Sequence, residues 1–324
     1  MKTAARSRIP YISTARVIGI LLVVLGHSYP FDVPIPRSLD LLRNFIYTFH
    51  MPLFILISGY LAAGSSRSAG NFIANRAKKL LLPYFILSLV AFLPKALVQQ
   101  YLNDSVSFSF SYLLRSELVP RENVWGHFWF LPVLFFLNVF SALMRKPLKR
   151  RNIRVFILAS AYLLLWLPET TDWFALEDLR KNLFWYVLGY LLADLHSFEK
   201  IIKNKLLLLG LPAAILLFLL PIDLQIVGTL LTISAILCLG TMINIERHLL
   251  MRTIERYSFT IFLLSWPFQA VVEVVLNKLL HLPVCISMIG MFTAGMVGPM
   301  ICICILNWIE KYLPMRWLKP ILGI

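Results

Sequence analysis

Long apolar stretches alternate with short polar connections along the whole chain, and most stretches have the length of a membrane-spanning helix. A helix needs about 20 apolar residues to cross the ~30 Å hydrocarbon layer. The pattern predicts ten spans with approximate limits 9–29, 45–64, 79–99, 126–144, 154–168, 182–195, 205–221, 226–245, 257–276 and 284–309. The fifth and sixth stretches are short for a full crossing. The sequence therefore predicts an all-α, polytopic membrane helix bundle, with residues 1–324 forming one integral membrane domain.

Composition supports this prediction and narrows the possible partners. Of the 324 residues, 59% are hydrophobic and only 15% are charged, and the mean hydropathy is +0.76. A soluble core of this size does not need so much apolar surface. The formal net charge is +15. No basic segment is interleaved with base-stacking aromatic residues, so nucleic acid is not an expected partner.

The basic residues gather in every second connection, and most acidic residues lie in the others. The N-terminal segment holds Lys2, Arg6 and Arg8, and the connection from 145 to 154 reads RKPLKRRNIR. Lysine and arginine concentrate in cytoplasmic loops, which face anionic lipid. The alternation therefore predicts that both termini are cytoplasmic.

The first apolar stretch and the cysteines do not indicate a secreted, disulfide-bonded protein. The stretch follows basic residues as a signal peptide does, but it ends in GHSYPF rather than in a small-residue cleavage site. We therefore expect an uncleaved first helix. Cys238, Cys285, Cys302 and Cys304 all lie in apolar stretches and form no CxxC pair. We expect them to pack as small hydrophobic side chains.

Arg16 and His27 stand out in the first apolar stretch because both are costly in lipid. They are eleven positions apart, which at 100° per residue places them on one helix face about 16 Å apart. Ionisable groups on one face of a membrane helix usually point into the bundle or into a wet cavity. In a second interpretation, Arg16 extends to the cytoplasmic interface and His27 caps the outer one.

Two further histidines lie near the outer ends of predicted spans. His50 is in the second span, NFIYTFHMPLFILISGYL, two residues before Pro52, which can bend the helix. His127 opens the fourth, NVWGHFWFLPVLFF, shortly before Trp129. Histidine has a pKa suited to a general base near neutral pH. The three histidines match no metal-ligand spacing, and Trp129 also fits an interfacial aromatic belt.

A basic group marks the cytoplasmic start of the third predicted span, NRAKKLLLPYF. Arg76 and Lys79 are three residues apart and share one helical face, and Lys78 lies between them in sequence. These side chains suit phosphate groups, while ordinary anchoring at the inner surface explains them as well. The sequence contains no glycine-rich phosphate loop, no HExxH and no nucleophile elbow.

Taken together, these motifs resemble the acyltransferase-3 family of membrane acyltransferases, and its fucose-4-O-acetylase-related branch in particular. The resemblance covers nearly the whole chain. It rests on an arginine and a histidine separated by ten residues, followed in order by FHMPLFILISGY, RAKKLLLPY, FWFLPVLFF and YSFTIFLLSWPFQ. It implies a ten-helix membrane bundle that moves an acyl group, usually acetyl from cytoplasmic acetyl-CoA, onto a carbohydrate being assembled at the membrane.

The resemblance also implies roles for single residues. The arginine–histidine pair that the family requires matches Arg16 and His27. The family's RxxR element matches Arg76 and Lys79, with lysine in place of the second arginine. The Ser-Gly pair of the second span matches Ser58 and the glycine after it, although small residues also simply permit close helix packing.

Two positions depart from the family's pattern. Many relatives have an acidic residue three positions before the first arginine or lysine, where this chain has Ser13. Many have a histidine near the end of the ninth-span motif, where this chain has Ser265. Ser265 is a candidate nucleophile only if a base lies nearby. Both departures put any relay through these two positions in doubt.

The sequence therefore predicts a multi-pass O-acyltransferase of a bacterial inner membrane. Acyl-CoA, most simply acetyl-CoA, is the expected co-substrate, and its phosphates would bind Arg76, Lys78 and Lys79, with Arg16 as a further candidate partner. A carbohydrate or lipid-linked glycan is the expected acceptor. His27, with His50 beside it, is the candidate general base. We expect no permanently bound cofactor and no metal.

The remaining candidates are contacts to the substrates, namely Ser58, His127, Trp129 and Ser265. His50, His127 or a backbone amide would donate to the oxyanion of the transition state. The alternative function is a transporter or flippase for a lipid-linked sugar or a small solute. A transporter explains a polar interior equally well, but it does not call for outer histidines combined with inner phosphate-binding residues. The sequence also lacks the paired broken helices typical of such transporters.

Overall fold

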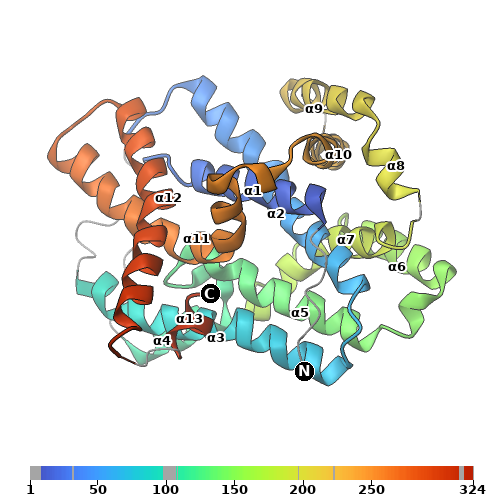
Figure 1. Ribbon diagram of the computed structural model, residues 1–324, viewed down its shortest axis with the longest axis horizontal. Helices are drawn as coiled ribbons and strands as arrows, with labels where there is room; N and C mark the ends of the chain where they lie inside the picture. The colour runs from blue at the N-terminus through green and yellow to red at the C-terminus, as the bar shows by residue number, and fades with distance from the viewer. Residues whose placement is uncertain are drawn as a thin grey trace. The chain divides into compact units, whose positions relative to one another are not determined.

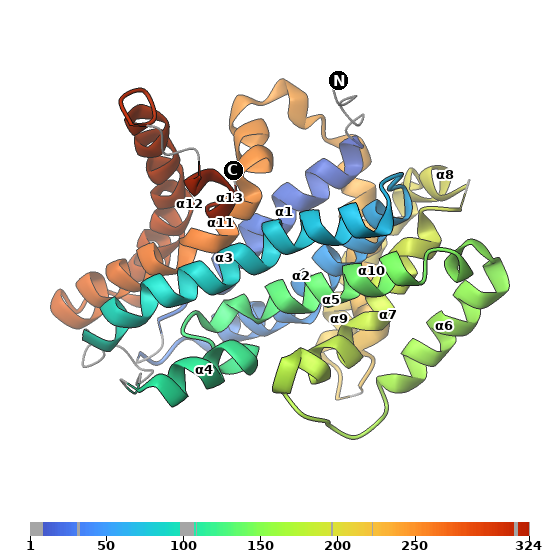
Figure 2. The ribbon, with the colours of Figure 1, turned by 90° about the horizontal axis from the view of Figure 1, so that it is seen from below.

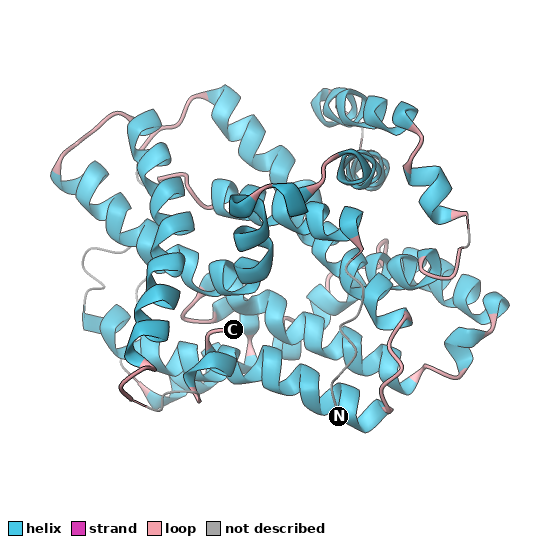
Figure 3. Cartoon of the chain, in the orientation of Figure 1, coloured by secondary structure: helices cyan, strands magenta, loops and turns pink. Residues whose placement is uncertain are grey.

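Helices form the regular structure throughout the part of the chain that the structure describes. The computed structural model describes residues 9–30, 33–97, 107, 109–195, 197–221, 223–313 and 317–323. No strand occurs among these residues (Figure 1, Figure 3), so the predicted all-α class is confirmed. Lys2, Arg6 and Arg8, which support the predicted orientation, and the end of the third predicted span at 98–99 lie outside the described residues.

The chain divides into two compact units, and each unit draws on two separate stretches of sequence. The first unit comprises Met1–Phe54 and His196–Ile301, and the second comprises Ile55–Leu195 and Cys302–Ile324. Two long helices, α2 (Arg37–Ala63) and α12 (Val284–Ile309), each contribute residues to both units.

In the first unit, α1 lies against the two long helices α10 and α11. Besides its parts of α2 and α12, this unit contains α1 (Pro10–Gly26), α8 (Phe198–Ile202), η6 (Lys205–Leu209), α9 (Gly210–Leu219), α10 (Gln225–Met242), η7 (Ile245–Arg247), α11 (Leu249–Glu273) and the π-helical segment η8 (Val274–Leu279). Helix α1 packs against both α10 and α11, and α9 packs against α10 (Figure 1).

In the second unit, α3 and α5 run side by side, and α7 packs against α5 and α6 (Figure 2). The elements of this unit are α3 (Ala69–Leu97), α4 (Phe110–Leu118), η2 (Pro120–Glu122), η3 (Gly126–Trp129), α5 (Phe130–Leu143), η4 (Pro147–Lys149), α6 (Arg151–Leu164), η5 (Trp173–Ala175), α7 (Leu176–Leu192) and α13 (Leu318–Ile321).

Every predicted span overlaps a helix, but the helices differ in length. Among the described residues, six stretches are long and apolar enough to cross a membrane: Arg37–Ala63, Ala69–Leu97, Gly126–Leu143, Gln225–Met242, Leu249–Leu279 and Val284–Ile309. The protein is therefore a multi-pass membrane protein. Helix α6 has 14 residues, about 21 Å at 1.5 Å per residue. The count of ten spans and the cytoplasmic termini stay predictions.

Several helices begin earlier than the apolar pattern predicts, among them α2, α3 and α11. Helix α2 begins at Arg37 rather than near 45, and α3 begins at Ala69 rather than near 79. The added turns are polar, and in α2 they hold an ion pair between Asp40 and Arg43 at 2.6 Å. Hydropathy marks only the part of a helix that suits lipid, so it misses polar turns at the ends. Arg76 and Lys79 consequently lie within α3 and not in its first turn.

Helix α1 preserves the spacing on which the sequence argument depends. It begins at Pro10, which suits a first helical turn because proline lacks an N–H donor that would go unpaired there. His27 directly follows the last helical residue, and its backbone N–H still donates to the Val23 carbonyl oxygen at 3.1 Å. The helical register from Arg16 therefore continues up to His27.

Two glycines of the second unit let α2 and α7 approach closely. A Cβ atom on Gly59 would lie 2.0 Å from the Tyr186 carbonyl oxygen, and one on Gly189 would lie 2.0 Å from the Leu56 carbonyl oxygen. Both obstacles are backbone atoms, which cannot rotate away. Gly59 of the Ser-Gly pair therefore serves the helix contact, as small residues often do in membrane bundles.

We predict that Gly59→Ala destabilises the protein. The added methyl group overlaps the α7 backbone, so the helices must separate, at a cost of about 1–3 kcal/mol or more. Thermal unfolding in detergent measures this change. Gly70→Ala is the matched control, because Gly70 is exposed in α3 and its Cβ would meet no atom within 4 Å. Equal stability of Gly59→Ala and the wild type would contradict the prediction.

Candidate active site

A polar cluster joins the N-terminal half of α1 to the start of α11. Arg16 donates from Nη1 to Glu255 Oε1 at 3.0 Å and from Nη2 to Ser258 Oγ at 2.9 Å. Ser13, one turn earlier, donates to the same oxygen of Glu255 at 3.4 Å. The Arg16 side chain is 32% exposed and the Glu255 side chain 8%. A buried carboxylate thus holds an accessible guanidinium, which argues against an arginine that merely extends to the interface.

At the other end of α1, an aromatic cluster brings His27 and His50 together. The Tyr47 ring centre lies 5.9 Å from that of His27 and 5.2 Å from that of His50. The Tyr47 hydroxyl donates to the Gly26 carbonyl oxygen at 2.8 Å. A Cβ on Gly26 would come within 2.8 Å of the Tyr47 ring. The glycine before His27 therefore makes room for the ring that contacts both histidines.

The hydrogen bond of His50 decides which of its ring nitrogens is available for chemistry. His50 Nδ1 lies 2.8 Å from the Ile46 carbonyl oxygen, and the residue is buried. A carbonyl oxygen only accepts, so Nδ1 must carry the proton. In the neutral ring, Nε2 then has the lone pair and can accept a proton. His50 is accordingly arranged as a base or a hydrogen-bond acceptor.

One face of α11 is polar, although α11 lies in an apolar stretch. Glu255, Ser258, Ser265, Gln269 and Glu273 are all buried, and at 100° per residue they lie within about 80° of one another. Polar side chains on a spanning helix normally face the protein interior. This face contacts α1 through hydrogen bonds at both ends, so α11 is the helix that supports the arginine–histidine pair.

Gln269 makes the contact at the end of α1 that carries His27. Its Nε2 atom donates to the Val24 carbonyl oxygen at 2.8 Å and lies 2.9 Å from Ser28 Oγ. Ser28 Oγ donates in turn to the Val24 carbonyl oxygen at 2.6 Å. These bonds fix the residues on both sides of His27. Gly295 of α12 permits the close packing, because a Cβ there would come within 2.9 Å of Gln269.

Ser265 lies on the same face of α11 but makes no comparable contact. It is 4% exposed, and no hydrogen bond joins its hydroxyl to another side chain in the described part of the chain. A serine nucleophile needs a general base within hydrogen-bond reach. Among the described residues, Ser265 therefore has no hydrogen-bonded base of the kind that a serine nucleophile requires.

In the second unit, the predicted phosphate-binding residues gain a neighbour that is distant in sequence. The guanidinium carbon of Arg76 lies 5.1 Å from the Phe72 ring centre, and that of Arg145 lies 5.8 Å from the same ring. Lys78 and Lys79 are exposed on α3. Two guanidinium groups beside one buried ring form a cation–π arrangement. Arg145, from the RKPLKRRNIR segment, thus belongs to this basic group.

His127 and Trp129 of η3 are packed against other side chains. His127 is buried, and its ring meets those of Trp125 and Phe128 edge-on, with centres 6.0 Å and 4.8 Å apart. The guanidinium carbon of Arg121 lies 3.9 Å from the Trp129 ring centre. Arg121 thus lies over one face of the Trp129 ring and connects the tryptophan to neighbouring polar residues.

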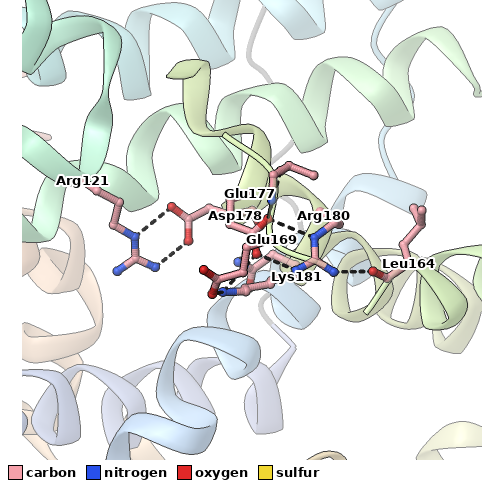
Figure 4. A network of polar contacts seen from close by, with 9 residues as sticks. Arg121, Leu164, Glu169, Glu177, Asp178, Arg180 and Lys181 are labelled. Atoms are coloured by element: carbon pink, nitrogen blue, oxygen red, sulfur yellow. Dashed lines mark hydrogen bonds and ion pairs between the residues drawn. The ribbon is translucent and has the colours of Figure 1, made fainter. Parts of the chain in front are cut away.

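The Arg121 contact belongs to a network of ion pairs at the start of α7 (Figure 4). Arg121 binds the buried Asp178 carboxylate with two hydrogen bonds of 2.9 and 2.5 Å. Glu177 pairs with Arg180 at 2.5 Å and with Lys181 at 3.0 Å. Arg180 above all, and then the Thr170 backbone N–H and Lys181, hold the pKa of the Glu177 carboxyl well below its usual range, although burial acts in the opposite direction.

The structure thus distributes the predicted residues over two groups. The first unit holds Arg16, His27, His50 and Ser265, and the second holds Ser58, Arg76, Lys78, Lys79, His127 and Trp129. Sequence reasoning missed Glu255, Tyr47, Gln269 and Arg145. The sequence did contain a signal for Glu255 and Gln269, because the polar residues in and just before the ninth predicted span recur at helical spacing on one face. No comparable spacing pattern in the sequence indicates the contacts of Tyr47 and Arg145.

An arginine held by a buried glutamate, and a histidine pair that shares one tyrosine, give a membrane protein of apolar helices a polar site. Residues 9–308 match the sequence model of the acyltransferase-3 family, described as an acyltransferase domain. This match covers most of the chain, and the protein therefore belongs to the acyltransferase-3 family. The resemblance noted from its motifs is confirmed.

Two curated proteins are also similar to this chain, and both carry the name nodulation protein NolL. The protein of Sinorhizobium fredii (strain NBRC 101917 / NGR234) is 32% identical over 189 residues, which is 55% of this chain and 46% of the relative. That of Mesorhizobium japonicum (strain LMG 29417 / CECT 9101 / MAFF 303099) is 30% identical over 187 residues, which is 56% of this chain and 46% of the relative. The match thus spans about half the length of these relatives. No solved structure matches the chain.

We expect Gln269→Leu to lower turnover more than it lowers stability. Leucine keeps the volume but removes the bonds to Val24 and Ser28, which costs about 1 kcal/mol in a membrane protein. The residues on both sides of His27 would then lose their fixed positions. Activity assays and thermal unfolding in detergent measure the two effects. Gln225→Leu, at an exposed glutamine of the same unit, is the control. Unchanged turnover would show that Gln269 does not position His27.

The depressed pKa of Glu177 predicts a stability effect that depends on pH. A carboxylate with a lowered folded-state pKa stabilises the protein above its unfolded pKa, near 4.5, and loses this contribution as the pH falls. Glu177→Gln should therefore lower the unfolding temperature at pH 7, and the difference from wild type should shrink below about pH 4.5. Glu169→Gln, at an 84% exposed side chain, should change little. A difference independent of pH would contradict the assignment.

Proposed function

We propose that the protein is a membrane O-acyltransferase that moves an acyl group, most simply acetyl, from cytoplasmic acyl-CoA to a hydroxyl of a cell-envelope or exopolysaccharide sugar. The observation that carries this proposal is the pair of ionisable residues on α1, Arg16 and His27, in a chain of the acyltransferase-3 family. Arg16 lies toward the start of this helix and His27 directly after its end, so an otherwise apolar segment carries two polar groups that substrates could contact.

The donor docks through its phosphates on the basic residues of α3. Arg76, Lys78 and Lys79 offer cationic donors, and Arg145 adds a second guanidinium beside Phe72. Arginine forms bidentate bonds with phosphate oxygens, which gives this group geometric as well as electrostatic complementarity. On α1, Arg16 provides a further polar partner for the uncharged part of the donor.

The transfer step uses His27 as the general base. His27 takes the proton from the sugar hydroxyl while the hydroxyl oxygen attacks the thioester carbonyl carbon. The tetrahedral intermediate collapses, the C–S bond breaks, and the proton passes from His27 to the leaving thiolate. The products are the O-acyl sugar and free CoA thiol. Atoms and charges balance without a metal or a redox cofactor.

His50 assists this step as an acceptor and not as a donor to the oxyanion. Its Nδ1 proton is already bonded to the Ile46 carbonyl oxygen, so a neutral His50 presents only a lone pair at Nε2. Of the candidates for oxyanion stabilisation, this leaves His127 and a backbone amide. The contact of His50 with Tyr47, which also touches His27, supports a shared role of the two histidines.

We expect His27→Ala to abolish acyl transfer. Loss of a general base lowers turnover about 100-fold or more. The measurement is acetyl-CoA-dependent O-acetylation of envelope glycans, in cells or membranes that contain equal amounts of inserted wild-type or variant protein. His248→Ala, at an exposed histidine whose side chain makes no cap hydrogen bond, should retain wild-type activity.

Two results would contradict the proposal in different ways. Glycan acetylation that persists in His27→Ala would remove His27 from the chemistry and leave it a packing role. A wild-type protein that transfers no acyl group to any glycan, but changes the distribution of a lipid-linked sugar across the membrane, would establish the transporter alternative.

A further inference from the structure

An arginine within an apolar helix requires a counter-charge, and α1 does not supply one. Isolated charges in apolar surroundings are costly, so they pair with another group of the bundle. Position 13, one turn before Arg16, is the place from which a carboxylate on α1 would reach the guanidinium at i, i+3 spacing. This chain has Ser13 there, and serine carries no charge.

The carboxylate comes instead from α11. Glu255 is separated from Ser13 by 242 positions, yet both Ser13 Oγ and Arg16 Nη1 donate to its Oε1 atom, at 3.4 and 3.0 Å. Glu255 is buried, and a buried carboxylate needs a charged partner or several donors to remain ionised. Ser13 therefore occupies the position from which α1 could have supplied a carboxylate, and it hydrogen-bonds to the carboxylate of α11 instead.

We propose that Glu255 is a positioning residue that supplies, from α11, the carboxylate that α1 lacks at position 13, and that it orients the Arg16 guanidinium toward the acyl donor. This inference rests on the proposed function. Glu255 fixes Nη1 and Ser258 fixes Nη2, so the plane of the guanidinium is set by two bonds from one helix. The side chain nevertheless stays 32% exposed and accessible to a ligand.

The pairing also determines what kind of group Arg16 contacts. Glu255 balances the positive charge of Arg16 at 3.0 Å, so this pair as a whole has little attraction for an anion. A charge-balanced guanidinium with five N–H donors suits an uncharged acceptor, such as a carbonyl or amide oxygen of the pantetheine arm or the thioester. The three positive charges of Arg76, Lys78 and Lys79 lie within one helical turn of α3 and suit phosphate groups better than this pair does.

A charge-relocation experiment tests this inference. Glu255→Gln removes the charge and keeps the side-chain size, whereas Ser13→Asp combined with Glu255→Gln returns the carboxylate to α1. We expect Glu255→Gln to raise the KM for acetyl-CoA about tenfold to hundredfold, as for loss of a charged hydrogen bond, and the double variant with Ser13→Asp to recover most of this loss. Ser13→Asn with Glu255→Gln has the same shape without the charge and should not recover. Glu199→Gln, in an exposed pair with Lys203, is the control.

Thermal unfolding of the same variants, together with Arg16→Gln, provides a readout without catalysis. Glu255→Gln and Arg16→Gln should be non-additive, and Ser13→Asp should restore the coupling to Arg16. Three results would overturn the inference: wild-type KM in Glu255→Gln, equal recovery by Ser13→Asn and Ser13→Asp, or a loss of activity that follows only the amount of folded protein. An inactive wild type would overturn the proposed function and the donor role of Arg16, while the stability cycle still decides whether Glu255 replaces the acid at position 13.

Discussion

The cost of placing a charged side chain among apolar helices shapes the first unit of this protein. Arg16 lies on a mainly apolar helix, and α11 provides Glu255 and Ser258 as its partners. Toward its other end, α11 provides Gln269, which binds Val24 and Ser28 around His27. One polar helix face thus secures both ends of α1, and the packing of α1, α11 and the glycine of α12 follows from that requirement.

Around the histidines, the backbone determines which ring nitrogen carries the proton and which side chains are in contact. The Ile46 carbonyl oxygen fixes the tautomer of His50, and the absence of a side chain at Gly26 lets Tyr47 reach the end of α1. A histidine whose Nδ1 proton is already bonded presents a lone pair at a defined position, which is the property a base or acceptor needs. The family assignment gives the protein a reaction class.

The second unit combines a basic face with a rigid framework. Gly59 and Gly189 bring the backbones of α2 and α7 into contact. The ion pair between Asp178 and Arg121 connects the start of α7 to η2 (Figure 4), and Arg121 also lies over the Trp129 ring of η3. Through this contact, the tryptophan contributes to the framework. The lysines of the basic group on α3 remain at the surface, where an anionic ligand can reach them.

By itself, the sequence determined the helical class, the approximate position of every long helix and the residues of the family motif, because hydropathy over a helix length and spacing along one helix are local properties. Arg16 and His27 could be placed on one face from their spacing alone. Only the tertiary structure decided that Glu255 meets Arg16, that Tyr47 joins His27 to His50, and that Arg145 lies beside Arg76. Each of these contacts joins separate elements of the chain, and helical periodicity carries no information about which face of one helix packs against another.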